Sequence, residues 1–404
     1  MSFKKDFPYF KFNKQDIYFD SAATSLKPKV VLDAENYYNT HIAANAHNNL
    51  FRNAFYANNL IDETRQLVAN FIGAYDKNEI IFTSGATQSL NTVAFGLKDY
   101  LNNEDEIVLT DLEHSSNLLP WRVLEEKINF KIKYFDLNDD GSICIEKIQN
   151  CVTKNTKVVS FASVSNTVGA ANNIKEIVKK IRSINKDVIV IIDAAQSIFH
   201  KLTNVKEWDI DFLAFSAHKM FGPFGLGILW GRMSWLEKIN PLMYGGGNNS
   251  FIEYDKFRLA KIPHKFEAGT LNLSAISGLK AAICYINQIG LSKIQNYLIM
   301  LKNHFVKAVE SLDKDKYIFY NLESDEPIIL MNIKGINAQD VGDFFNKKYN
   351  ILVRVGKHCA RLSHHFLKVE NTLRISLSIY NEKADLDTLI LALNDIDNWM
   401  ETVL

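Results

Sequence analysis

Short β-branched runs alternate with longer amphipathic stretches between about residues 79 and 230. The runs that predict strands lie at residues 80–83, 106–110, 157–162, 188–192, 212–215 and 227–230. Amphipathic stretches that predict helices lie at residues 88–97, 116–127 and 174–184. Because the strands are apolar on both faces, the pattern predicts an α/β fold with a mostly parallel sheet covered by helices.

The last third of the chain predicts a second, smaller unit. A helical pattern runs from Ser274 toward Gly290, and a strand, a helix and a strand are predicted at residues 328–333, 338–347 and 373–377. No internal repeat or Ser/Gly/Pro-rich linker occurs, so the two units are expected to pack closely. We expect a large domain at residues 15–283 and a small α+β domain at residues 284–404, which the segment 1–14 joins.

Charge and composition exclude several classes of protein. The 46 Lys and Arg residues balance 46 Asp and Glu residues, so no global field favours nucleic acid or an anionic membrane. The first residues contain no apolar signal core, and no apolar stretch reaches the roughly 20 residues of a membrane helix. We therefore expect a cytoplasmic protein. Four scattered cysteines without a CxxC pair argue against a disulfide framework and a Cys-based zinc site, and no metal is expected.

Distinctive polar residues follow the predicted strands. They are Ser84 to Thr87, His114, Asn166, Asp193 and Ser216 to Lys219. Ligands of open α/β sheets bind at the carboxyl ends of the strands, so these residues are expected to form one site.

An acid and a lysine suggest the chemistry of this site. Asp193 closes an apolar strand, where a buried carboxylate needs a partner, and the ring nitrogen of pyridoxal 5'-phosphate (PLP) would provide one. Lys219 lies in an apolar, glycine-flanked stretch that favours a neutral, nucleophilic amine able to form a Schiff base. Asp193 could instead cap a following helix, and most lysines are solvated surface groups.

Two further strand ends have both a functional and a structural interpretation. The turn that contains Ala86 and Thr87 separates a strand from a helix, where backbone N–H groups can hold a phosphate or simply form an N-cap. His114 could stack on a flat heteroaromatic ring and exchange protons, or cap a helix.

Cys359 and Arg374 are two further candidate functional residues, both in the C-terminal part of the sequence. Cys359 lies among Arg354, Lys357, His358 and Arg361, and positive neighbours favour a reactive thiolate over the buried, inert state of most free cysteines. Arg374 is a lone arginine in an apolar strand, and either an amino-acid carboxylate or an internal salt bridge would satisfy it.

Over nearly its whole length the chain resembles the class V aminotransferase-like PLP enzymes, and within them the cysteine desulfurases of the SufS/CsdA type (group II). The segments that carry the resemblance occur in the family's order at residues 17–24, 113–114, 165–169, 193–196, 216–219, 267–270 and 354–360. The resemblance implies the type I PLP-dependent transferase fold, a homodimer, and conversion of L-cysteine to L-alanine.

The resemblance also implies a role for each site residue. Lys219 would bind PLP and move the α-proton, Asp193 would pair with the pyridine nitrogen, and His114 would stack on the ring. Residues that would contact the ring hydroxyl are Gln196 and Asn166. Residues that would hold the phosphate are Ala86, Thr87, Ser216 and His218, with Thr270 contributed across the dimer. Arg374 and Arg354 would bind the substrate carboxylate, and Cys359 would carry the sulfur as a persulfide to an acceptor protein, as in iron–sulfur cluster assembly.

Some positions depart from the family's pattern. Lys357 stands where the family usually has a histidine, and it should make the thiol more acidic if it points inward. Arg361 follows Ala360 where Gln-Pro or a similar pair is usual, and Asn48 replaces an arginine near the dimer interface. Gln339 lies in a small-domain region where acceptor-specific residues could occur.

Several alternatives remain open from the sequence. An aminotransferase or a kynureninase-like lyase needs no thiol, so Cys359 in its basic loop argues against both. A selenocysteine lyase could use the same site. A non-catalytic scaffold is disfavoured because both Lys219 and Cys359 are present.

Overall fold

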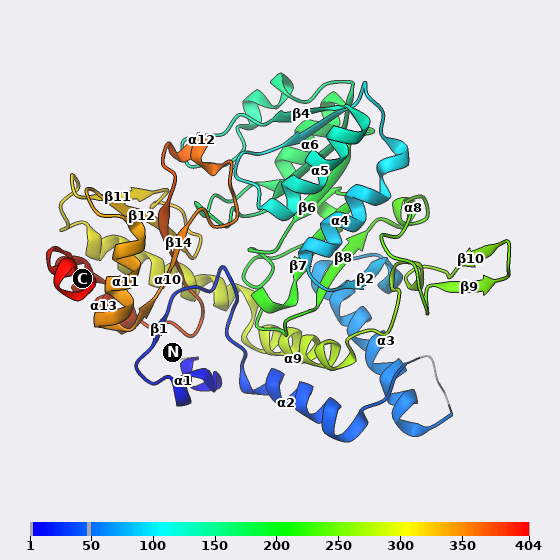
Figure 1. The fold of residues 1–404 in the computed structure, drawn as a ribbon, viewed down its shortest axis with the longest axis horizontal. Helices are drawn as coiled ribbons and strands as arrows, with labels where there is room; N and C mark the ends of the chain where they lie inside the picture. The colour runs from blue at the N-terminus through cyan, green and yellow to red at the C-terminus, as the bar shows by residue number, and fades with distance from the viewer. Residues whose placement is uncertain (1–2, 47–49, 404) are drawn as a thin grey trace.

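A seven-stranded sheet forms the centre of the computed structural model, which describes residues 3–46 and 50–403 (Figure 1). The strands lie in the order β2 (Ile80–Thr83), β8 (Gly227–Gly231), β7 (Phe212–Ser216), β6 (Ile189–Asp193), β5 (Thr156–Ala162), β3 (Glu106–Leu109) and β4 (Lys131–Tyr134). β8 runs antiparallel to the other six strands of this sheet, which are parallel to one another. The predicted mostly parallel sheet is therefore confirmed.

Helices cover both faces of the sheet because one side of each is apolar. They are α4 (Ala86–Gly96), α5 (Ser115–Ile128), α6 (Ile174–Ile184) and the short α7 (Val205–Trp208) and α8 (Met233–Leu236). In α6, Ile174, Ile177, Val178 and Ile181 are buried at helical spacing, and Asn173 caps the first turn. The strands they cover are buried on both faces, as the continuous apolar runs predicted.

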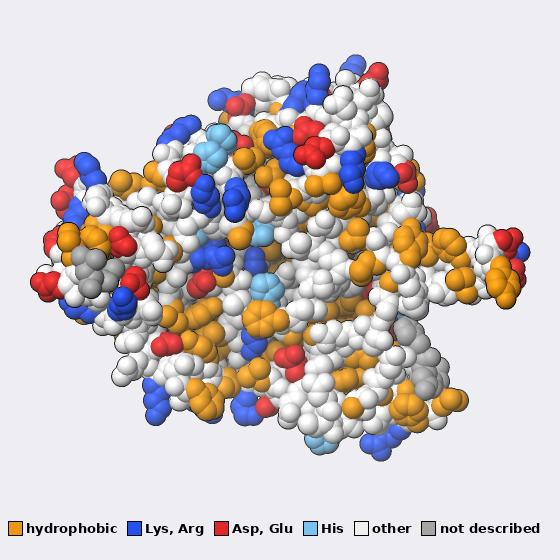
Figure 2. Space-filling model, viewed as in Figure 1, with side chains coloured by type: hydrophobic (Ala, Val, Ile, Leu, Met, Phe, Trp, Pro, Cys, Tyr) orange, Lys and Arg blue, Asp and Glu red, His pale blue; other side chains and the backbone are white. Residues whose placement is uncertain are grey.

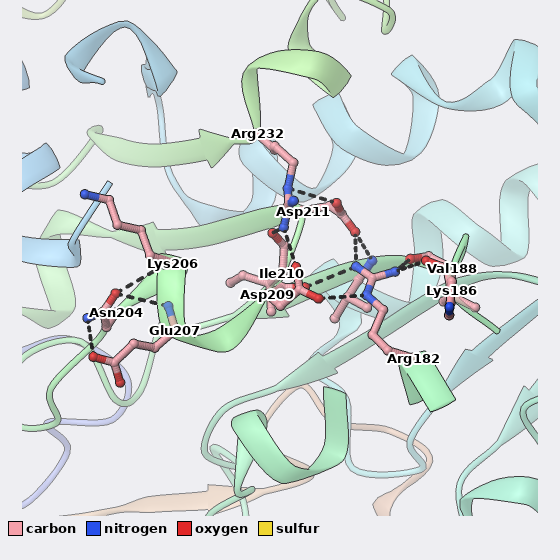
Figure 3. A network of polar contacts seen from close by, with 11 residues as sticks. Arg182, Lys186, Val188, Asn204, Lys206, Glu207, Asp209, Ile210, Asp211 and Arg232 are labelled. Atoms are coloured by element: carbon pink, nitrogen blue, oxygen red, sulfur yellow. Dashed lines mark hydrogen bonds and ion pairs between the residues drawn. The ribbon is translucent and has the colours of Figure 1, made fainter. Parts of the chain in front are cut away.

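A network of polar contacts lies at the amino-terminal ends of the central strands β6 and β7 (Figure 3). Arg182 of α6 donates to the Asp211 carboxylate at 2.9 Å, and Asp211 also accepts the backbone N–H of Val190 at 2.9 Å. Arg232, just after β8, donates to Asp209 at 2.9 Å. These charges satisfy one another, so we assign the network a structural role.

The C-terminal part of the chain forms a second, smaller sheet. Its antiparallel strands lie in the order β11 (Tyr317–Tyr320), β12 (Ile328–Ile333), β15 (Thr372–Ser376) and β14 (Arg354–Gly356). The helices after α9 (Leu273–Ile289) are α10 (Leu291–Val309), α11 (Ala338–Tyr349), α12 (Ser363–Leu367), α13 (Lys383–Asn394) and α14 (Trp399–Val403). The predicted small α+β unit is present.

The N-terminal segment reaches both sheets. After α1 (Tyr9–Phe12), β1 (Ile17–Tyr18) pairs parallel to β13 (Ile351–Leu352) beside the smaller sheet. The helices α2 (Lys29–Tyr37) and α3 (Arg52–Ile72) then pack against α9. The predicted boundary between residues 283 and 284 falls inside α9, and the two domain ranges stay a prediction.

A hairpin projects from the large unit, as Figure 1 shows at the right. It consists of β9 (Asn249–Ile252) and β10 (Phe257–Leu259). In the part of the chain that the structure describes, no helix is both long and apolar enough to serve as a membrane span.

Candidate active site

The polar strand ends line one cavity of about 180 Å³ between the two sheets. Twelve of the predicted site residues line it: Ala86, Thr87, His114, Asn166, Asp193, Gln196, Ser216, His218, Lys219, Arg354, Cys359 and Arg374. Thr270 instead lines a separate cavity with Ser84 and Gln88. The structure therefore brings twelve predicted residues together, and the predicted role of Thr270 in a partner's site stays a prediction.

Lys219 and Asp193 lie on adjacent strand ends. Lys219 ends the turn after β7, and burial lowers the pKa of its amine to about 8 even though the charge of Asp193 opposes this effect. Asp193 accepts the N–H of Ala195 at 2.9 Å, but this bond closes a turn and no helix begins at Ala194, so the alternative of a helix cap is wrong. That bond does not remove the carboxylate from the cavity, which Asp193 also lines.

The turn before α4 provides donors beside Lys219. The N–H of Ala86 donates to the Ser216 hydroxyl at 2.8 Å, and the Thr87 and Ser116 hydroxyls lie 2.7 Å apart. A Cβ on Gly227 would lie 2.4 Å from the Gly85 Cα, so only glycine lets β8 approach this turn so closely. The first N–H groups and the positive dipole end of an eleven-residue helix thus face the cavity.

His218 has a buried nitrogen that points to a missing partner. Its Nδ1 atom makes no hydrogen bond within residues 3–46 and 50–403, although it is buried. Burial and the charge of Lys219 lower the pKa of His218 to about 4, so the ring is neutral at pH 7. Its ring stacks on Phe224, with centroids 5.5 Å apart. A buried polar atom without a partner is rare in native proteins, and a bound phosphate or ring would supply one.

His114 forms the predicted helix cap, and its stacking on a cofactor ring stays a prediction. Its Nδ1 accepts the N–H of Ser116 at 3.1 Å and so caps α5, while its ring lines the cavity. Burial and the charge of Lys219 lower its pKa. The cap fixes the ring orientation, and the neutral form suits stacking and proton exchange.

Glu113 supports His114, a role that was not predicted from the sequence. It accepts hydrogen bonds from Thr110 at 2.6 Å, from Asn117 at 2.6 Å and from the N–H of Ala162 at 3.2 Å. Burial raises its pKa to about 7. Glu113 therefore ties the His114 turn to the end of β5. An acid directly before a strand-end histidine was the only signal for it in the sequence.

Arg374 forms one of its two predicted contacts, the internal salt bridge, and its binding of a substrate carboxylate stays a prediction. Its Nη2 lies 3.1 Å from the Asp20 carboxylate, and its Nη1 donates to the Asn166 carbonyl at 2.8 Å. Its Nε is buried and lacks a hydrogen-bond partner in the described residues. The internal salt bridge therefore exists, and one donor of the guanidinium group is still unpaired beside the cavity.

The amides of Asn166 and Gln196 are used by the protein itself. The Asn166 Nδ2 donates to the His358 carbonyl at 2.8 Å, and the Gln196 Nε2 donates to the Ala22 carbonyl at 2.9 Å. Both residues line the cavity, and their predicted contact with a ring hydroxyl stays a prediction.

Cys359 lies at the rim of the cavity and is exposed. An Arg354 guanidinium nitrogen lies 3.9 Å from its sulfur. The alternative of a buried, inert cysteine is therefore wrong, because the thiol is accessible both from the cavity and from outside.

Lys357 does not point toward the thiol. It forms an ion pair with Glu370, so the condition that it points inward is not met. Arg361 is exposed. Gln339 lies in the first turn of α11, where its N–H donates to Asn337 at 2.9 Å. Asn48 lies outside the described residues.

The residues present fit PLP. Asp193 can pair with a protonated ring nitrogen, Lys219 can form the Schiff base, and the turn before α4 with Ser216 and His218 can hold the phosphate. The unpaired Nδ1 of His218 is the observation that favours an occupant of this kind. Among the described residues, no three His, Cys, Asp or Glu side chains gather in a way that could hold a metal ion.

Comparison with known proteins identifies the family of the chain. The family model for class V aminotransferases matches residues 17–389. A probable cysteine desulfurase from Ureaplasma parvum is 38% identical over 393 residues, which cover 97% of this chain and 96% of the relative.

Two solved structures have the same fold. A cysteine desulfurase from Thermococcus onnurineus, solved in its apo form, superposes with a TM-score of 0.91 at 34% identity over 97% of this chain and 96% of the other. The cysteine desulfurase CsdA from Escherichia coli superposes with a TM-score of 0.90 at 28% identity over 100% of this chain and 98% of the other. The resemblance and the type I fold predicted from the sequence are confirmed, and the chain belongs to the PLP-dependent class V aminotransferase family.

Proposed function

We propose that this protein is a cysteine desulfurase that converts L-cysteine to L-alanine with PLP and holds the sulfur as a persulfide on Cys359. One observation carries the proposal: an exposed cysteine lines the same cavity as Lys219 and Asp193. An aminotransferase or a lyase without sulfur transfer needs no thiol there. The names of the similar proteins support the same activity.

The arginines of the small sheet bind and orient the substrate. Arg374 offers its unpaired Nε, and Arg354 adds a second positive charge on the neighbouring strand β14. A carboxylate held at this end directs the rest of the amino acid toward Lys219.

Lys219 moves the α-proton of the substrate. Because burial lowers its pKa to about 8, roughly a tenth of the amine is neutral at pH 7, far more than for an ordinary lysine, and this neutral form can accept a proton. When bound, PLP stabilises the negative charge that remains on the substrate after this proton leaves. His114, held by Glu113 and its cap, is placed to exchange further protons.

Cys359 accepts the sulfur. Its thiolate attacks the substrate sulfur, an S–S bond forms, and the Cβ–S bond breaks with its electron pair staying on the carbon side, which takes up a proton. Cysteine and the Cys359 thiol thus become alanine and a Cys359 persulfide, and the step needs no external oxidant. The exposure of Cys359 supports transfer of this sulfur to an acceptor protein, with iron–sulfur cluster assembly as the destination.

The proposed active unit is a homodimer. Thr270 lies away from its own chain's cavity, as a residue that completes a partner's phosphate site would. The β9–β10 hairpin exposes Phe251, Ile252 and Phe257, and Figure 2 shows its hydrophobic side chains standing clear of the body. Large exposed apolar patches are uncommon in monomers and support a buried interface.

The test supplies the PLP-loaded protein with L-cysteine and a reductant, and it measures alanine, sulfide and the intact mass of the protein. We expect equal amounts of alanine and sulfide, and one added sulfur atom on Cys359 when the reductant is omitted. Lys219→Ala should abolish both products, and Cys359→Ala should strongly reduce them. Cys284→Ala is the matched control, because this exposed cysteine lies on α9.

The proposal fails if the PLP-loaded protein forms no alanine even when candidate acceptor proteins are added. Transfer of the amino group to a 2-oxo acid in the same samples would instead identify an aminotransferase. Sedimentation of the purified protein would contradict the dimer if it showed only monomers at micromolar concentration.

A further inference from the structure

The backbone that carries Cys359 adopts an uncommon conformation. His358 and Cys359 have φ values of 50° and 58°, and Gly356 has a φ of 110°. Residues other than glycine rarely occupy the left-handed region because their Cβ crowds the backbone, and two in succession are rarer still. Such a conformation persists only where surrounding contacts enforce it.

The small sheet binds the loop that carries Cys359 through β15. The His358 ring, which is buried, lies 2.8 Å from the Thr372 hydroxyl of β15. The N–H of Ala360 closes a turn with the carbonyl of Lys357 at 2.9 Å. The first bond attaches the loop to its own sheet and the second closes the loop on itself, and neither involves the carbonyls of His358 and Cys359.

The large unit provides those partners. Ser115 donates two hydrogen bonds to the Cys359 carbonyl, one from its N–H at 2.7 Å and one from its hydroxyl at 2.8 Å. Asn166 donates to the carbonyl of His358 at 2.8 Å. Two successive carbonyls of the loop are therefore bound by Ser115 and Asn166 of the large unit.

The position of Ser115 in its helix strengthens the contact. Ser115 is the first residue of α5, so its N–H belongs to the set that has no acceptor within the helix. The Cys359 carbonyl thus meets the positive end of a fourteen-residue helix as well as two donors. No role for Ser115 was predicted from the sequence.

We propose that Ser115 is a positioning residue for sulfur transfer. By binding the Cys359 carbonyl it stabilises the left-handed backbone and holds the thiol at the rim, where it faces both the cavity and the exterior. The inference deepens the proposed function and rests on it for its kinetic part. Ser115 itself does not touch the reacting atoms; it acts through Cys359.

Three substitutions separate the two donors of Ser115. Ser115→Ala removes the hydroxyl alone. Ser115→Pro removes the hydroxyl and the N–H, and proline is accepted at the first position of a helix. The preceding residue, His114, already has φ −60° and ψ 145°, which is the conformation that a following proline favours. Ser115→Thr keeps both donors and is the conservative control.

The first measurement is hydrogen exchange of the peptide that spans residues 354–361 in the protein without PLP. Exchange should be faster in Ser115→Ala than in the wild type, faster again in Ser115→Pro, and unchanged in Ser115→Thr. This order does not depend on any reaction. Equal exchange in all four proteins would overturn the inference.

The second measurement is the kinetics of alanine formation with L-cysteine. We expect kcat to fall about 10- to 100-fold in Ser115→Pro, because a misplaced reacting group costs a factor of this size, and to fall less in Ser115→Ala. KM and PLP content should stay close to the wild-type values. A loss of PLP binding in parallel with kcat would show that the change acts on α5 and His114, and would overturn the positioning role.

The two measurements distinguish failure of the proposed function from failure of the inference about Ser115. If the wild type forms no alanine, the proposed function fails, while the exchange series still decides whether Ser115 holds the loop. If Ser115→Pro does not fold, the comparison of Ser115→Ala with Ser115→Thr decides the inference by the same two measurements.

Discussion

Arg374 and Asp20 form an ion pair at the wall of the active-site cavity, with 3.1 Å between Nη2 and Oδ1. Arg374 belongs to β15 of the small sheet, and Asp20 lies in the N-terminal segment that follows β1. The arginine is only 2% exposed, and the carbonyl of Asn166 accepts a second bond from it. The pair holds the guanidinium group in a fixed orientation before a substrate arrives.

Arg374→Lys should weaken substrate binding while PLP still binds. Lysine keeps the positive charge that Asp20 requires but loses the planar fork that binds a carboxylate with two bonds. We expect KM for L-cysteine to rise at least about 10-fold, the size of effect that loss of a charge-assisted hydrogen bond produces. Steady-state alanine formation measures it, and absorbance of bound PLP serves as the control for folding.

Arg361→Lys is the matched substitution for this test, since Arg361 is an exposed arginine of the loop that carries Cys359. It should leave KM unchanged. An unchanged KM in Arg374→Lys as well would mean that the arginine serves only its ion pair with Asp20.

The sequence was sufficient to predict the cavity because its residues follow strands. A parallel sheet aligns the carboxyl ends of its strands, so Asp193 after an apolar run and Lys219 after the next one had to lie near each other. The paired register of β5 and β6, which places Ala162 opposite Asp193, shows the same alignment. Strand periodicity therefore located the site without knowledge of any long-range contact.

Side-chain directions and long-range partners were not predictable in this way. Nothing in the loop sequence shows that Lys357 pairs with Glu370, or that Ser115 binds a carbonyl 244 residues further along the chain. The long helix α3 was not predicted either; its buried face mixes small and polar residues with large apolar ones, among them Ala57, Thr64, Arg65, Leu60, Ile61 and Val68. These features depend on tertiary contacts that local patterns do not encode.

Arg354 and Lys357 should differ in their effect on Cys359. The guanidinium group of Arg354 lies 3.9 Å from the sulfur and attracts a thiolate, whereas the charge of Lys357 is neutralised by Glu370. Arg354→Ala should slow alkylation of Cys359 by iodoacetamide at pH 7 several-fold, and Lys357→Ala should change it by less than about 2-fold, as for a screened surface ion pair. Mass spectrometry of the Cys359 peptide gives both rates. Equal slowing in the two variants would contradict this assignment.

Lys219 should titrate well below an ordinary lysine. Burial lowers its pKa to about 8, against about 10.4 for a free side chain. In the protein without PLP, competitive acetylation of Lys219 should be weak below pH 8, where the amine is protonated, and reach a plateau above it. Asp193→Asn should move this midpoint to lower pH, because the carboxylate opposes the effect of burial. A midpoint near 10 in both proteins would show that Lys219 is solvated.

The lowered pKa of Lys219 should also affect stability. Between pH 8 and about 10.4 the unfolded chain binds a proton at this lysine that the folded chain does not, so the free energy of unfolding contributed by Lys219 rises with pH in this window. Urea unfolding of the protein without PLP should therefore show a steeper rise for the wild type than for Lys219→Met, which lacks the titrating group.

Glu326 should make the contact between the two units sensitive to acid. This carboxylate is 3% exposed, lies 2.7 Å from the His200 Nε2 and forms a second ion pair with Lys201. Burial raises its pKa, but the hydrogen bond and charge of His200 and the charge of Lys201 outweigh burial and hold it at about 2. Glu326 precedes β12 of the small sheet, whereas His200 and Lys201 follow β6 of the large one.

The direction of the pH effect follows from the lowered pKa of Glu326. Above pH 4.5 both the folded and the unfolded chain carry the charge, and the stabilisation is complete; it is lost as pH falls from about 4.5 toward 2. Because a tenfold change in proton affinity corresponds to about 1.4 kcal/mol, the ion pairs of Glu326 contribute roughly 3 kcal/mol at neutral pH.

Glu326→Gln should therefore lower the free energy of unfolding by about this amount at pH 7, and the difference in this free energy between the variant and the wild type should narrow steadily below pH 4.5. Glu370→Gln, which removes an exposed acid paired with Lys357, should leave the pH 7 value nearly unchanged. Urea unfolding from pH 3 to pH 7 measures all three proteins, and a gap that stays constant over this range would show that the Glu326 charge does not hold the two units together.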